Sequence, residues 1–247
     1  MTFQLIKWAL LAFCLNLTLP AMVFAQDCIL PNSVLIHSCQ TDMVVRLRVL
    51  PQSKAADDTA LLTVAGTYSS GDRFGIEGLV IKDGKTISHR YQNWDGVLVI
   101  DAKGNPRLYH ASNVSLAGLN FNLKEKPLRD AFIRKAKALG VTVLQSHLLI
   151  TEGVLDLKDV DDAPKFKRRL FVTLKDGSFA IWETAQTETL YDAAHQLQDE
   201  LAPLMAFNLD MGAYDYCVLG PEGAQKNCGS LLVSKDKLTN LLEFSKG

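Results

Sequence analysis

The chain has 247 residues, with 26 Lys or Arg against 27 Asp or Glu, which gives a formal net charge of −1 at pH 7. Such a balance excludes the electrostatic footprint of a protein that binds nucleic acid or an anionic membrane surface. The length is sufficient to bury a substantial core, and one domain is the expectation, although the size alone also permits two.

Residues 1–25 have the pattern of a secretory signal peptide. Lys7 provides a thin positive start, the stretch from Trp8 to Leu19 is apolar, and Val23-Phe-Ala25 loosely satisfies the rule for the cleavage site. The apolar stretch is shorter than the roughly 20 residues that span a bilayer, and no later segment is long or apolar enough to do so. The sequence therefore predicts export, periplasmic or extracellular, without stable membrane insertion, and a mature chain covering residues 26–247.

Cysteine usage agrees with export. Four cysteines follow the predicted cleavage site, namely Cys28, Cys39, Cys217 and Cys228. They allow three pairings, and the simplest joins Cys28 to Cys39 and Cys217 to Cys228. Each short loop would stabilise the fold by about 3 kcal/mol on the chain-entropy model. A metal site is the alternative, but no CxxC pair accompanies them.

Four hairpins are predicted in the middle of the chain, because apolar runs recur on both sides of turns that contain glycine. They cover Gly78–Ile87, Val97–Tyr109, His147–Leu155 and Leu170–Trp182. Asp83-Gly84 and Asp176-Gly177 suit tight turns, since both residue types tolerate the positive φ that such turns require. The segment Asp156–Lys167 is charged and aperiodic, and it is predicted to be a surface loop.

The first of two predicted helices covers Pro127–Leu139. Its apolar stripe consists of Leu128, Phe132, Ala136 and Leu139, and Gly140 is a natural C-terminal stop.

The second predicted helix covers Thr189–Leu201. Its stripe consists of Leu190, Ala194, Leu197 and Leu201. Thr189 and Asp192 form a weak capping box, and Pro203 prevents continuation. Apolar strands follow both helices, at Val141–Leu144 and Leu204–Leu209, so both helices are expected to pack on the sheet. The predicted class is α+β, with a mixed, largely antiparallel sheet built of hairpins.

The segment Ala206–Tyr216 carries the strongest signal of a functional site. It opens as a buried strand and places Asp210 at the strand end, before Gly212 and a run of polar and aromatic residues. A carboxylate at the end of a packed strand is typical of a site, whereas the alternative is that Asp210 only caps a turn. The histidines outside the signal and the hairpins, His37, His89, His110 and His195, show no spacing typical of a metal site, and no metal ligand is predicted.

Four segments in chain order share one resemblance. They are Gly78-Leu-Val-Ile-Lys-Asp-Gly-Lys85, Gln145-Ser-His-Leu-Leu-Ile-Thr-Glu-Gly153, Arg168-Arg-Leu-Phe-Val-Thr-Leu-Lys-Asp-Gly177 and Ala206-Phe-Asn-Leu-Asp-Met-Gly212. Together they resemble the phosphodiester glycosidase family over roughly Leu61 to Val218. The resemblance implies hydrolysis of a sugar 1-phosphodiester, and therefore a carbohydrate or sugar-phosphate substrate. It implies no organic cofactor, while a divalent ion near Asp210 stays an open alternative.

The resemblance also implies roles for single residues. Asp210 would act as base or nucleophile at an oxocarbenium-like transition state, and Arg168 would hold the phosphate through its planar guanidinium. The candidate substrate-binding residues are Asn208, Gly212, Ser146, His147, Tyr68 and Tyr214. Alternatives remain at three positions: Arg168 as a solvated charge, Asn208 as a partner of backbone groups, and His147 as a partly buried polar residue.

Several positions depart from the family pattern. Val64 stands where the family has Asn, and His147-Leu148 replaces Gly-Pro. Met211 replaces a glycine, and Ala213-Tyr-Asp215 replaces Gly-Ser-Ser, so the expected pocket is narrower. Two functions follow from these changes. One is an exported hydrolase acting on a glycosyl phosphodiester of envelope or extracellular glycans. The other is a catalytically silent relative that binds a glycan or a protein partner.

Overall fold

The computed structural model describes residues 30–38, 42–51, 59–70, 75–221, 223–230 and 238–247. The predicted signal peptide and the predicted Cys28–Cys39 pair lie outside the described residues. Within the described part of the chain, no helix has both the length and the apolar character that crossing a bilayer requires.

The described strands form three large sheets and one small ribbon, in which every pairing is antiparallel. We name the sheets the α1 sheet (β5-β4-β10-β6-β7), the α2 sheet (β1-β14-β13-β15-β11-β12) and the terminal sheet (β17-β16-β3-β18-β2).

The α1 sheet contains β4 (Gly78–Lys82), β5 (Lys85–Arg90), β6 (Gly96–Ile100), β7 (Pro106–His110) and β10 (Thr142–Ser146). The α2 sheet contains β1 (Val34–His37), β11 (Leu148–Thr151), β12 (Val154–Leu155), β13 (Arg169–Thr173), β14 (Phe179–Glu183) and β15 (Met205–Asn208). The terminal sheet contains β2 (Met43–Val49), β3 (Leu62–Ala65), β16 (Cys217–Leu219), β17 (Lys226–Asn227) and β18 (Asn240–Lys246), and the ribbon pairs β8 (Val114–Leu116) with β9 (Leu119–Phe121).

All four predicted hairpins are present, as β4–β5, β6–β7, β11–β12 and β13–β14. In the first, Asp83 and Gly84 have φ values of 48° and 75°. Two successive residues with positive φ match the twist of the flanking strands. The α+β class and the antiparallel hairpins predicted from the sequence are confirmed.

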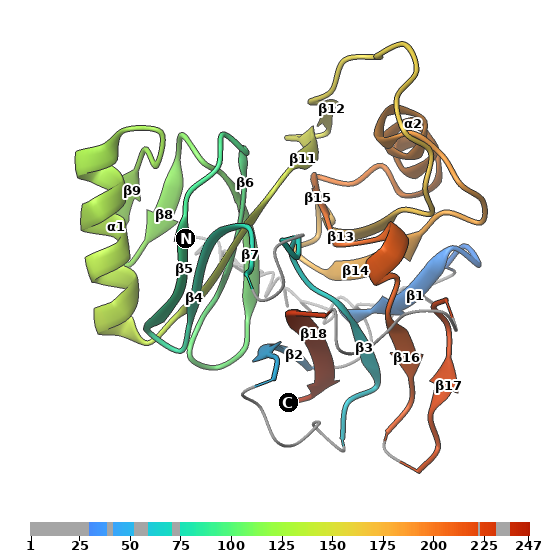
Figure 1. Cartoon of the computed structure of the whole chain (residues 1–247), viewed down its shortest axis with the longest axis horizontal. Helices are drawn as coiled ribbons and strands as arrows, with labels where there is room; N and C mark the ends of the chain where they lie inside the picture. Colours follow the sequence, from blue (N-terminus) through green and yellow to red (C-terminus); the bar gives the residue numbers. More distant parts are fainter. Residues whose placement is uncertain (1–29, 39–41, 52–58, 71–74, 222, 231–237) are drawn as a thin grey trace, which may run out of the picture.

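Helix α1 (Lys126–Leu139) covers one face of the α1 sheet, on the left in Figure 1. Gly140, with a φ of 66°, ends the helix as predicted. The predicted apolar stripe is wrong at both ends, since Leu128 and Leu139 are each 39% exposed while Phe132 and Ala136 are buried. Both exposed leucines lie in the terminal turns of the helix, so the sheet is covered by its middle turns.

Helix α2 (Leu190–Leu201) packs on the α2 sheet through the buried residues Ala193, Ala194 and Leu197. The Thr189 side chain accepts the backbone N–H of Asp192 at 3.0 Å, which confirms the predicted cap.

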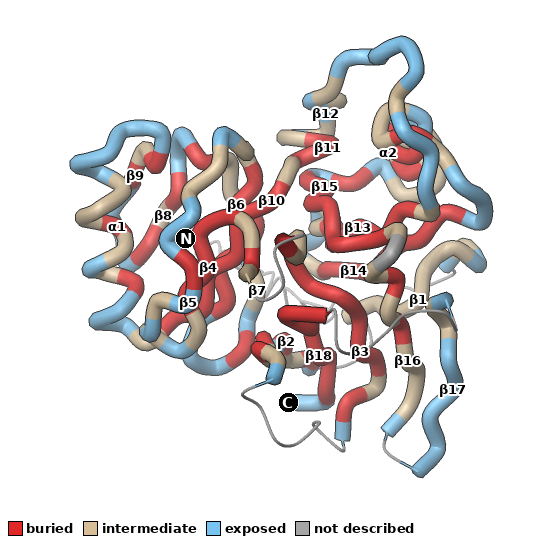
Figure 2. Tube along the Cα trace, viewed as in Figure 1, coloured by how far each residue is buried: buried red, intermediate tan, exposed pale blue. Residues whose placement is uncertain are grey.

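A central core joins the three sheets, and Figure 2 shows their buried strands converging on the middle of the molecule. Strand β10 of the α1 sheet is followed by β11 of the α2 sheet, and only His147 lies between these two strands in the chain. The ends of β3 and β15 lie at this crossing, because the Asn208 N–H donates to the His147 carbonyl at 2.9 Å and the Asp210 N–H donates to the Gly66 carbonyl at 2.7 Å. Polar groups from three sheets therefore meet there.

Candidate active site

Asp210 follows β15 and is 4% exposed. Its carboxylate oxygen Oδ2 accepts the Ser69 N–H at 2.8 Å. Burial raises the pKa of Asp210 from its ordinary 3.8 to about 6, even though hydrogen bonds from Ser69 and from the Met211 amide oppose that rise. The carboxyl group is therefore held in place and titrates close to neutral pH.

The segment after β3 is fixed by Asn240, at the start of β18. The Asn240 side chain accepts the Thr67 N–H and donates to the Thr67 carbonyl, both at 2.8 Å. Gly66 is required at this point because a Cβ there would lie 2.1 Å from Asn240 Oδ1. Asn240 was not identified from the sequence, where its one signal is a polar residue at the head of an apolar C-terminal strand.

The Tyr68 hydroxyl lies at the centre of the polar group and accepts a close hydrogen bond from Asn208 Nδ2. Burial raises the pKa of Tyr68 to about 12; the Asn208 contact and the Arg168 charge lower it, while the Asp210 charge raises it further. The carboxylate and the guanidinium therefore both act on this one hydroxyl. At neutral pH the phenol is protonated, and it also interacts with the Ser146 hydroxyl.

Asn208 and Ser146 complete this polar group. The Ser146 hydroxyl donates to the Asn208 carbonyl at 2.7 Å. Asn208 is 1% exposed, and its side-chain oxygen Oδ1 has no hydrogen-bond partner among the described residues. A buried acceptor without a donor is costly, by about 1–3 kcal/mol, and such groups are uncommon unless a ligand or water supplies the donor.

Arg168 lies immediately before β13 and is 7% exposed. Its Nε donates to the Glu188 carbonyl at 3.0 Å and its Nη2 donates to the Pro164 carbonyl at 2.6 Å. The guanidinium carbon lies 5.2 Å from the centre of the Phe166 ring. The alternative of a solvated charge is therefore wrong, and burial lowers the pKa of Arg168.

An aromatic cluster adjoins the polar group. The ring centres of Tyr68 and Trp94 are 5.0 Å apart, and those of Trp94 and His147 are 5.2 Å apart. His147 is partly buried, and this burial lowers its pKa despite the opposing charge of Asp95. The imidazole is therefore neutral at pH 7.

Gln145 positions this aromatic cluster and was also missed in the sequence. Its Nε2 donates to the carbonyls of Gln92 and Trp94, at 2.7 and 2.9 Å. Its Oε1 accepts the N–H groups of Leu79 and Gln92, both at 3.1 Å. A buried glutamine with every such bond made is a rigid support for the turn that carries Trp94.

Of the residues after Asp210, Gly212 lies beside Phe166, whereas Tyr214 packs against a separate apolar cluster. Gly212, with a φ of 74°, opens the short 3-10 turn η2 (Gly212–Tyr214), and a Cβ added to it would lie 3.5 Å from the Phe166 ring. Met211 is 9% exposed. Tyr214 packs beside the apolar cluster of Ala65, Leu238 and Leu241, and no described contact joins it to Asp210 or Arg168.

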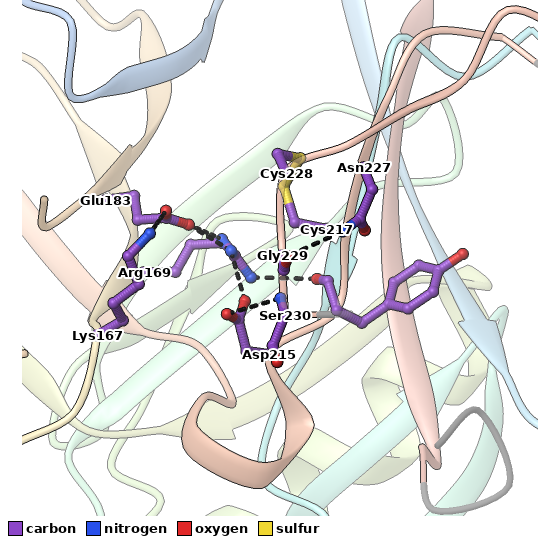
Figure 3. Close-up of a disulfide and its surroundings, with 10 residues drawn as sticks. Lys167, Arg169, Glu183, Asp215, Cys217, Asn227, Cys228, Gly229 and Ser230 are labelled. Atoms are coloured by element: carbon purple, nitrogen blue, oxygen red, sulfur yellow. Dashed lines mark hydrogen bonds and ion pairs between the residues drawn. A yellow bond between two sulfur atoms is a disulfide. The ribbon is translucent and has the colours of Figure 1, made fainter. Parts of the chain in front are cut away.

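The residues that directly follow this turn take part in a disulfide and in a buried ion network (Figure 3). Cys217 and Cys228 are bonded, which confirms that predicted pair. Arg169 is fully buried and is paired with Glu183 and Asp215. Asp215 also accepts the Ser230 N–H at 3.0 Å. Of the two neighbouring arginines, Arg169 therefore anchors the backbone beyond Gly212, while the charge of Arg168 influences Tyr68.

One set of side chains has the geometry to hold a divalent ion, although no metal ligands were predicted from the sequence. Ligand atoms of Asp95, His110 and Asp156 lie within 4.8 Å of one another. Asp95 also accepts the Leu148 N–H at 2.9 Å, which places this set next to His147. The three residues are brought together by strand pairing, Gly96 opposite His110 and Ile150 opposite Leu155, so the linear spacing gives no signal.

Comparison with known proteins places the fold. No protein-family model and no curated protein matches the chain. Among solved structures, the catalytic domain of zebrafish N-acetylglucosamine-1-phosphodiester alpha-N-acetylglucosaminidase, auto-inhibited by its pro-peptide, is similar at a TM-score of 0.54 and 14% identity. That match covers 83% of this chain and 73% of the zebrafish domain.

A hypothetical protein from Synechocystis is also similar, at a TM-score of 0.50 and 12% identity, over 83% of this chain and 57% of that one. The chain thus resembles the zebrafish domain in fold. At these identities the likeness is one of fold alone.

Proposed function

We propose that the chain is an exported member of the phosphodiester glycosidase family that hydrolyses a glycosyl phosphodiester of envelope or extracellular glycans. One observation carries this proposal: Asp210 and Arg168 lie just beyond the adjoining ends of the paired strands β15 and β13, and both charges influence Tyr68. The likeness in fold to the zebrafish glycosidase domain supports it. Carboxylate, cation and neutral hydrogen-bond donor are the groups that cleavage of a sugar phosphodiester requires.

Asp210 is the residue that meets the anomeric carbon. Ser69 fixes one carboxylate oxygen, and the carboxylate would attack the sugar or deprotonate a water that does so. A new C–O bond forms at the anomeric carbon while the bond from that carbon to the phosphate oxygen breaks. The electron pair leaves with the phosphate, which is a weak base and needs little protonation.

Arg168 is oriented to bind the phosphate. Carbonyl groups hold its Nε and one N–H of Nη2, so the remaining N–H groups of the planar guanidinium have no protein acceptor among the described residues. A phosphodiester oxygen would pair with them and would compensate this buried cation.

Export is supported by the Cys217–Cys228 disulfide, because disulfides persist mainly in oxidising compartments. The pattern of residues 1–25 supports it independently.

A second candidate function is that of a catalytically silent binding protein. The low exposure of Asp210, 4%, and of Met211, 9%, favours this candidate, as does the cover of the Phe166 ring over Gly212. A binding protein tolerates a buried carboxylate, whereas a hydrolase must bring it into contact with substrate.

Release of sugar from a panel of sugar 1-phosphodiesters decides between these functions. The proposal predicts saturable release by the wild type and a loss of at least 10³-fold in Asp210→Asn. Asp130→Asn, which changes an exposed carboxylate on α1, is the matched control and should retain activity. Equal inactivity of wild type and Asp210→Asn, with both proteins folded, would favour the binding function.

A further inference from the structure

Trp94 differs from the other tryptophan that the structure describes. Trp182 is fully buried and its indole N–H donates to Glu200 at 2.7 Å, as expected of a core residue. Trp94 is only partly buried, and no described residue accepts its indole N–H. It lies between β5 and β6, with Tyr68 and His147 against its ring.

The Trp94 ring is held rigidly. Gln145 donates to its carbonyl at 2.9 Å, and a Cβ on Gly78 would approach the ring atom Cζ3 to 3.0 Å. One edge of the indole therefore packs against a bare glycine backbone. A rigid aromatic ring with an unpaired N–H and residual exposure is suited to ligand contact, since little entropy is lost on binding.

The polarity of the site changes in order from this ring toward Arg168. Trp94 and His147 form an aromatic side next to Tyr68. The Tyr68 hydroxyl bonds Asn208, whose Oδ1 is unpaired among the described residues. Asp210 bonds the next residue, Ser69, and Arg168 precedes the strand paired with the one that ends before Asp210. A pyranose phosphate has the same sequence of surfaces, with an apolar C–H face, hydroxyl donors and an anion.

We propose that Trp94 is the sugar-stacking residue of this site. The C–H face of a pyranose lies on the indole, a sugar hydroxyl or amide donates to Asn208 Oδ1, and the phosphate pairs with Arg168. This assignment rests on the proposed function for the class of ligand, a glycosyl phosphate, but it does not require that the ligand be hydrolysed.

Binding measurements on the full chain test the assignment. The probes are α-hexose 1-phosphates, N-acetylhexosamine 1-phosphates and inorganic phosphate, followed by calorimetry. Trp94→Leu should raise the Kd for the sugar phosphates about tenfold and leave the Kd for inorganic phosphate unchanged. Trp94→Phe keeps an aromatic face and should raise it only about threefold. Phe166→Leu, which acts on the Arg168 side, should weaken both kinds of probe alike.

A second readout is tryptophan fluorescence, in which the wild type is compared with the conservative variant Trp94→Phe. Saturation with sugar phosphate should shift the emission of Trp94, identified as the difference between wild type and Trp94→Phe, whereas inorganic phosphate should not. Trp94→Leu or Trp94→Phe variants that bind sugar phosphates as the wild type does would overturn the assignment, and so would a wild type that binds none of them. Trp94-dependent binding without hydrolysis would sustain it and would refute only the proposed enzymatic activity. Hydrolysis with a KM insensitive to Trp94 would refute the assignment alone.

Discussion

Removal of the Asp210 charge should change how stability depends on pH. Burial raises the pKa of this carboxyl from 3.8 to about 6 in the folded protein, so folding favours the protonated form. The difference of about two pH units corresponds to about 3 kcal/mol of unfolding free energy. This contribution is fully present below pH 3.8, is lost as the pH rises toward 6, and is constant above it.

The assay is urea unfolding of the wild type and of Asp210→Asn at half-unit steps from pH 3.5 to 8. Asparagine does not titrate, so the difference between the two proteins isolates the Asp210 contribution from that of every other group. We expect the wild type to lose about 3 kcal/mol relative to the variant between pH 3.5 and 6.5, with no further change above that. A flat difference, or one that grows with pH, would show that the carboxyl is solvated or is stabilised as an anion. The same ionisation should appear in activity as a rise in kcat/KM with an apparent pKa near 6.

Three further predictions concern the groups around Asp210. Arg168→Lys should lower kcat/KM on sugar 1-phosphodiesters by about 10²-fold, because an ammonium group lacks the planar fork; a change below threefold would remove Arg168 from the site. Arg169→Met should lower the unfolding free energy by about 3–5 kcal/mol, since it leaves buried carboxylates unpaired. Lys167→Met changes a half-exposed cation and is the control for both arginine variants. It should lower the unfolding free energy by at most about 1 kcal/mol. A loss equal to that of Arg169→Met would refute the assignment of the buried network. The double change of Cys217 and Cys228 to Ser should cost about 3 kcal/mol in urea unfolding, and a reductant should destabilise the wild type alone.

Much of the fold follows from local patterns. The glycine turns identified all four hairpins, because a tight turn between apolar runs determines the pairing of adjacent strands. The caps at Thr189 and Gly140 identified the ends of two helices. The arrangement of the strands into three sheets was not predictable, since it depends on pairings such as β13 with β15 and β3 with β18 that join distant segments. The exposure of Leu128 and Leu139, at the ends of the α1 stripe, was also not predictable, because it depends on how far the sheet extends beneath the helix.

The candidate site was only partly visible in the sequence. Asp210, Asn208 and Arg168 were identified by their places in the segments with the family resemblance. The structure places Asn208 and Asp210 at Tyr68 and Ser69, and Arg168 at the adjoining end of β13. The supporting residues Asn240 and Gln145 were missed because their hydrogen bonds go to distant backbone groups, which no linear spacing reveals. Phe166, in a predicted loop, and Trp94, between two predicted hairpins, were missed for a related reason, because a single aromatic residue acquires a role only through its neighbours.

The most direct test of the central claim is the position of bond cleavage. A sugar 1-phosphodiester is hydrolysed in ¹⁸O-enriched water by the wild type, and the released phosphomonoester is analysed by mass spectrometry. Attack at the anomeric carbon beside Asp210 predicts a phosphomonoester free of ¹⁸O, and no release by Asp210→Asn. Label in the phosphomonoester would show cleavage of the P–O bond, and together with undiminished release by Asp210→Asn it would contradict the account.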